Sequence, residues 1–169
     1  MIAITENDPF LYNYVRTMSE MMQSFRRDVD PNEPPLAYPG GMSQFLVEHG
    51  SFYRPAALRE DVKRGVIKQC FDNAYKLALR RRWRYVEGYA ISSTLPLPIH
   101  HAWAIDENDR VVDNTWRDIG SSYFGVEFPV GYMREVRKRT DLWPALDNHK
   151  NFDLYRTKYD PSALASVGQ

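Results

Sequence analysis

Apolar residues near the start of the chain recur at steps of three and four positions, which predicts an amphipathic helix. Asn7 or Asp8 followed by Pro9 provides a start signal, a capping oxygen and then a proline at the first helical position. We expect this helix to end near Asp28, before Pro31. Its methionines are expected to face the core, and the apolar positions are Leu11, Tyr14, Val15, Met18, Met21, Met22 and Phe25.

The next segment, residues 31–41, is rich in proline and glycine and predicts a loop. A short helix is expected from Ser43 to His49, stopped by Gly50. We interpret residues 1–55 as an N-terminal helical appendage packed on a domain formed by residues 56–169.

Residues 56–68 have a helical pattern that Gly65 interrupts, and a clearer apolar face follows. If Gly65 or Lys68 breaks the helix, Cys70 lies in the first turn of a new one. There the free N–H groups and the positive end of the helix dipole stabilise a thiolate. If one helix runs through from residue 60, Cys70 is a small core residue in its middle. The second apolar face consists of Ile67, Cys70, Phe71, Ala74, Leu77 and Ala78.

Residues 83–91 alternate and are rich in aromatic and β-branched side chains, which predicts a strand. A hairpin is expected farther along the chain, around an acidic turn. A three-residue loop from Asp106 to Asn108 pairs Ile105 with Asp109 and gives Asn108 the left-handed conformation.

This register sets His101 opposite Asp113 on the same side of the sheet, where opposed Cβ atoms are ~5 Å apart. A two-residue loop would instead set Asn114 opposite His101. Either partner fixes the tautomer of a histidine base. We favour Asp113, because a carboxylate also stabilises the imidazolium that forms.

The segment beyond Trp116 begins with a group of aromatic residues. Helices are expected over residues 130–139 and from Leu142 to Leu146, and the polar end after Tyr159 is expected to fray. The aromatic residues are Tyr123, Phe124, Phe128 and Tyr132.

Composition limits the classes of function. A chain of 169 residues has the size of one domain, and its 22 basic and 22 acidic residues cancel, so no overall field draws it to nucleic acid or a membrane. No apolar run approaches the ~20 residues that span a bilayer, and the N-terminus lacks the features of a signal peptide, so a cytoplasmic protein is expected. The histidines lack ligand spacing and no glycine-rich phosphate loop occurs, so neither a metal nor a cofactor is expected.

The candidate chemistry lies in the middle of the chain. Cys70, the single cysteine, precedes His101, which precedes Asp113, the order of a thiol nucleophile, its base and the residue that orients the base. Alternation sends the neighbouring His100 to the other face of its strand. Gln69 either helps to bind an oxyanion or is a polar residue at a helix start.

The aromatic neighbours Trp103 and Trp116 are expected to form walls of the cleft or to pack in the core. Asn114 remains the alternative third member of the triad.

The motifs Gln69-Cys70-Phe71, His101-Ala102-Trp103 and Val112-Asp113-Asn114-Thr115 resemble the transglutaminase-like cysteine protease superfamily, which has a papain-like fold. The resemblance covers residues 66–116. It departs from the family at Lys68, where glycine is common, and at Asn114, where proline is frequent.

By this resemblance, Cys70, His101 and Asp113 form the triad of a cysteine hydrolase or acyltransferase. The implied fold is α+β, with the cysteine on a helix packed against a small antiparallel sheet that carries the histidine and the aspartate. The family includes thiol peptidases, amidases, deamidases, crosslinking transglutaminases and inactive members. A protein or peptide substrate is therefore expected.

Two basic runs, residues 80–85 and 134–139, support a rival hypothesis. In it the chain is a non-catalytic module that binds an acidic protein partner or nucleic acid. The balanced net charge favours the simpler interpretation that both runs are solvated helix surfaces.

Overall fold

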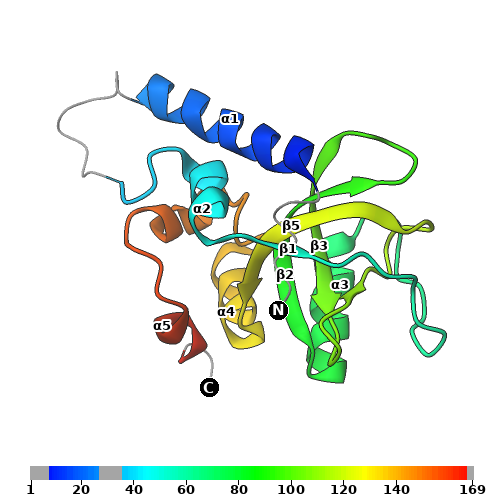
Figure 1. Ribbon diagram of the computed structural model, residues 1–169. Coiled ribbons are helices and arrows are strands. Elements are labelled where there is room, and N and C mark those ends of the chain that lie inside the picture. Colours follow the sequence, from blue (N-terminus) through cyan, green and yellow to red (C-terminus); the bar gives the residue numbers. More distant parts are fainter. Residues whose placement is uncertain (1–7, 27–35, 167–169) are drawn as a thin grey trace.

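The computed structural model describes residues 8–26 and 36–166. These residues form helices that pack against an antiparallel sheet, so the fold class is α+β (Figure 1). The sheet has five strands in the order β1-β5-β2-β3-β4. The strands are β1 (Ser51–Tyr53), β2 (Arg84–Ser92), β3 (Pro98–Ile105), β4 (Val111–Val112) and β5 (Gly120–Phe128). The helices are α1 (Pro9–Arg26), α2 (Gly41–His49), α3 (Cys70–Arg81), α4 (Val130–Thr140), α5 (Pro161–Ala165) and the 3-10 helix η1 (His149–Tyr155).

The sheet carries a different cluster on each of its faces. Along β2, the alternate residues Tyr85 and Ile91 belong to the large core that α1 to α4 complete. Val86 and Ala90 point to the opposite face and pack with Trp103. Residues of β2 thus belong to both clusters, and in Figure 1 α3 runs beside β2 and β3.

Helix α1 starts as predicted, because the Leu11 N–H donates to Oδ1 of Asp8 at 3.0 Å and Pro9 takes the first helical position. Leu11 and Val15 are buried in the core. The expectation that the apolar stripe faces the core is wrong for its last part, since Met21, Met22 and Phe25 are exposed. Figure 1 shows the reason: this end of α1 extends past the strands.

The remainder of the 1–55 segment shares the core of the whole chain. Helix α2 ends before Gly50, as predicted, and buries Phe45 and Leu46. Strand β1 then pairs with β5 and adds Phe52 to the same cluster. Pro31, Pro34 and Pro35 of the predicted loop lie outside the described residues.

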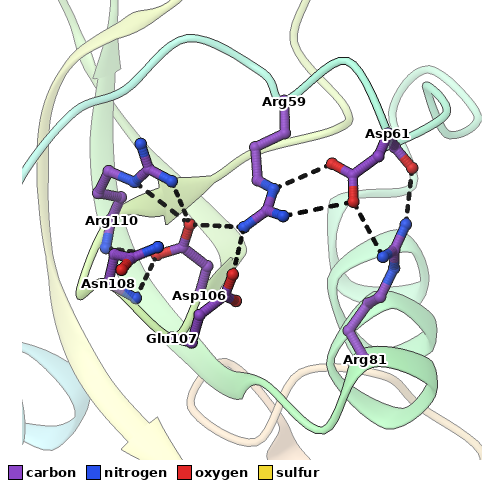
Figure 2. Close-up of polar contacts among 7 residues, drawn as sticks. All are labelled: Arg59, Asp61, Arg81, Asp106, Glu107, Asn108 and Arg110. Carbon is purple, nitrogen blue, oxygen red and sulfur yellow. Dashed lines mark hydrogen bonds and ion pairs between the residues drawn. The ribbon is translucent and has the colours of Figure 1, made fainter.

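The helix expected over residues 56–68 does not form. Ion pairs between arginine and carboxylate side chains, some of them from distant parts of the chain, hold this segment in place of helical hydrogen bonds. Arg59 binds the carboxylates of Asp61, Asp106 and Glu107, and Arg81 at the end of α3 also binds Asp61 (Figure 2). This network fixes the segment to both the hairpin and α3.

The hairpin has a different register from both predicted ones, with Ile105 opposite Val111. The buried carboxylate of Asp106 explains this register. Its Oδ1 accepts the N–H groups of Asn108 and Arg110, so Asp106 closes the loop (Figure 2). Asp109, rather than Asn108, takes the left-handed conformation, with φ of 59°.

In the last third of the chain, α4 confirms the helix predicted over residues 130–139. The helix predicted from Leu142 to Leu146 is wrong, because the Ala145 and Leu146 N–H groups donate to the buried Glu87 carboxylate instead. After Tyr159, α5 forms a short helix capped by Asp160.

Candidate active site

Cys70 is the first residue of α3, so of the two arrangements that the sequence left open, the helix that begins at Cys70 is the one that forms. Lys68 takes the left-handed conformation, with φ of 66°, and this redirects the chain just ahead of the helix. The thiol is half-buried. Its position places it beside the free N–H groups and the positive dipole end of α3.

His101 lies on β3, and its Nε2 contacts Oδ2 of Asp113 at 2.7 Å. Strand β4 is short and pairs with Ala104 and Ile105 only, so the outer edge of β3 beside His101 is left to the loop that carries Asp113. The predicted pair of residues is therefore in contact, although the predicted register was wrong. The ring is 2% exposed.

The charges around His101 favour its protonated form. Burial alone lowers the pKa of the ring, but hydrogen bonds with the Asp113 and Cys70 side chains, and their charges, outweigh burial and raise the pKa to about 9. The structure thus brings Cys70, His101 and Asp113 together.

Asp113 is held by several donors. Its Oδ1 accepts the N–H of Thr115 at 2.9 Å and that of Trp116 at 3.3 Å, and its Oδ2 accepts the Tyr123 hydroxyl at 3.1 Å. Burial works to raise the pKa of this carboxyl, but His101 and the two backbone donors outweigh burial and lower the pKa. The carboxylate is therefore ionised and has its position fixed.

Two tryptophans bracket the histidine. The Trp116 ring stacks on His101 with centroids 4.1 Å apart, and it is half-buried, so it shields the imidazole from water. Trp103 is completely buried and packs against Tyr123 in the core, not on an accessible cleft wall. A Cβ on Gly125 would lie 2.9 Å from the Trp103 ring, so the glycine makes room for the indole.

The remaining predicted residues lie beside the triad. Gln69 is exposed and precedes α3, and its carbonyl accepts the Asn73 N–H. The Asn114 side chain donates to the carbonyl of Lys63, while His101 bonds Asp113. Asp113, not Asn114, is thus the histidine's partner.

His100 points to the opposite side of β3, as its alternation predicts. Its ring packs against Phe71 and Tyr89. Burial lowers its pKa to about 4, so the ring is neutral near pH 7. His100 therefore lacks the carboxylate partner that His101 has.

Two supporting residues were not identified from the sequence. Tyr123 reaches Asp113 from β5, and the buried Asn73 bonds the backbone of Val66 and the hydroxyl of Thr115. The position of Asn73, one turn after Cys70 on the same helix, was the only available signal.

Four side chains of the basic runs are engaged in contacts within the molecule. Arg81 binds Asp61, Arg84 binds Glu127, and Arg139 binds Asn151. The Arg137 guanidinium lies 3.9 Å from the centroid of Trp143, a cation–π contact. These contacts leave fewer free cations than the sequence implies.

The described residues contain no group of three or more His, Cys, Asp and Glu side chains that could hold a metal ion. Among the described helices, none is both long and apolar enough to cross a membrane. No protein family, curated protein or solved structure matches the chain.

Proposed function

We propose that this protein is a cysteine-dependent acyl-transfer enzyme with Cys70 as nucleophile, His101 as general base and Asp113 as the residue that orients the base. One observation carries the proposal: a buried imidazole is bound by a carboxylate at 2.7 Å through Nε2, and the only thiol of the chain lies close enough to act with that carboxylate in raising the pKa of the ring. This is the arrangement that activates a thiol nucleophile.

The chemistry follows from the three roles. The Cys70 thiolate attacks the carbonyl carbon of an amide or ester, and the oxyanion that forms lies near the N–H groups at the start of α3. The His101 imidazolium then gives its proton to the leaving amine or alcohol, leaving a thioester on Cys70. Water or an amine attacks the thioester with His101 as base, which releases the acyl group and restores the thiol.

The resemblance to the transglutaminase-like superfamily adds a class to this proposal. A helix that begins with the cysteine, packed on an antiparallel sheet with the histidine, is consistent with a papain-like core. A protein or peptide substrate is proposed on that basis. The reaction is then that of a thiol peptidase, amidase, deamidase or transglutaminase.

The rate of alkylation by iodoacetamide as a function of pH tests the proposal. Cys70 is the only thiol, so the rate reports on this residue without background. We expect fast alkylation well below pH ~8.5, where an ordinary thiol ionises, and a slow, ordinary profile in His101→Ala. An ordinary profile in the unmodified protein would refute the ion pair and with it the proposed nucleophile.

A further inference from the structure

A pocket of about 480 Å³ lies beside α3, on the side of the helix that faces the 61–65 segment. Its inner wall is formed by the buried side chains of Val62, Asn73 and Leu77. Exposed cationic side chains surround its mouth, and they belong to Lys63, Arg64, Lys76, Arg80 and Arg81.

The charge of this pocket is not balanced from within. Asp61 is the one acidic residue of the lining, and its carboxylate is already bound by Arg59 and Arg81 (Figure 2). Lys76 pairs with Asp72, which lies outside the lining. A pocket lined by charges of one sign concentrates the field and attracts the opposite charge.

Three of the lining cations keep their charge for a ligand. Arg64 donates to the backbone carbonyls of Trp116 and Arg117, which holds its position without neutralising it. Among the described residues, the Lys63 and Arg80 side chains have no ion-pair partner. The lining therefore carries an excess of positive charge.

The pocket adjoins the candidate triad. Asn73 lies one helical turn after Cys70, and its side chain donates to Thr115, whose own N–H donates to Asp113. Asn114, the neighbour of Asp113 in sequence, also lines the pocket. A substrate polypeptide bound at Cys70 therefore passes close to these cations.

We propose that this pocket binds an acidic segment of the polypeptide that serves as acyl donor, an inference that rests on the proposed function. Lys76, whose ammonium is shared with Asp72, and Arg80 are four residues apart on α3, so their Cβ atoms are ~6 Å apart. Alternate residues of an extended peptide are separated by a similar ~7 Å. A peptide with Asp or Glu at every second position matches this spacing.

The lining also distinguishes between kinds of anion. It contains no aromatic ring on which the base of a nucleotide could stack. The apolar contribution comes from Val62 and Leu77, which suit the aliphatic part of a peptide.

Binding is measured by fluorescence anisotropy with the Cys70→Ala protein, so that no turnover intervenes. The probe is a labelled peptide with glutamate at alternate positions, and its counterpart has glutamine at the same positions. We expect the glutamate peptide to bind and the double change Lys63→Gln with Arg80→Gln to weaken it about tenfold, as the loss of two charge pairs predicts. The control, Arg134→Gln with Lys138→Gln on α4, makes the same change in net charge elsewhere and should leave the affinity within about twofold.

Three results would overturn the proposal. The glutamate peptide does not bind, both double variants weaken its binding equally, or the protein binds tripolyphosphate but does not bind the glutamate peptide. A slow ordinary alkylation profile together with normal peptide binding would refute the proposed enzyme and leave the acidic-peptide site in place.

Discussion

The Tyr123 hydroxyl donates to Oδ2 of Asp113 at 3.1 Å, the same oxygen that contacts His101. Tyr123 belongs to β5, which is separated from β3 by β2 in the sheet. The phenol therefore crosses over β2 on one face of the sheet and holds a carboxylate that lies beyond β3. Burial and the Asp113 charge both raise the pKa of Tyr123, so its hydroxyl stays a donor.

Removal of this hydroxyl should loosen the carboxylate without disturbing the fold. We expect Tyr123→Phe to lower the free energy of unfolding by about 1–3 kcal/mol, because a hydrogen bond to a charged group is lost, and to slow Cys70 alkylation at neutral pH severalfold. The matched control is Tyr53→Phe, because the Tyr53 hydroxyl donates to Glu127 on the same face of the sheet. Equal alkylation rates in the two variants would mean that Tyr123 does not position Asp113.

The Asp113 charge should be visible in the titration of His101. Burial lowers the pKa of the ring, and Asp113 is the first partner that outweighs burial, giving a pKa of about 9. In Asp113→Asn the pKa of His101 should therefore fall by about 1–3 pH units, measured by NMR of the histidine ring protons. His49, which contacts the Tyr38 hydroxyl away from the site, should titrate identically in both proteins. An unchanged midpoint for His101 would contradict the pairing.

The same interaction predicts how stability depends on pH. The pKa of His101 is raised from 6.5 to about 9 on folding, so its stabilising effect is fully present below pH 6.5 and is lost as the pH rises through 9. The loss is on the order of 3 kcal/mol. Urea unfolding of the unmodified protein and of His101→Gln should give free energies that converge as the pH rises over this range. Parallel curves would rule out a raised pKa.

The three residues of the candidate triad could be selected from the sequence, because they sit at recognisable local features. Cys70 stands at a helix start and His101 on an apolar strand. The contact between His101 and Asp113 was predicted from a hairpin register that is wrong by two residues. It holds because Asp113 follows the end of β4, where its side chain reaches His101 independently of strand pairing.

The strand β5 and the residues that support the triad could not be predicted in the same way. Most residues of β5 are buried, including consecutive ones, so it shows little of the alternation that identifies a half-buried strand. The contacts of Tyr123 and Glu87 join residues that local pattern does not connect. Such pairs are fixed by tertiary packing.

Glu87 offers the clearest test of that packing. It lies in the middle of β2 and is completely buried, where it accepts the Tyr85 hydroxyl at 2.8 Å and the N–H groups of Ala145 and Leu146 at 2.8–3.0 Å. The carboxylate therefore fastens the 141–148 segment to the sheet. Burial raises its pKa to about 7, and the hydrogen bonds offset part of that rise.

In Glu87→Gln the amide NH₂ places two N–H donors where a protonated carboxyl has one O–H, against the N–H groups of Ala145 and Leu146, so the variant should lose about 1–3 kcal/mol of unfolding free energy. The pKa of Glu87 is raised from 4.5 to about 7, so the folded protein holds a proton between these values that the unfolded chain releases. The associated stability is present below pH 4.5 and is lost as the pH rises through 7. Urea unfolding should therefore show a larger deficit for Glu87→Gln at pH 5 than at pH 8. The exposed Glu60→Gln should show no deficit at either pH, and an equal deficit for Glu87→Gln at both would contradict a carboxyl held protonated by burial.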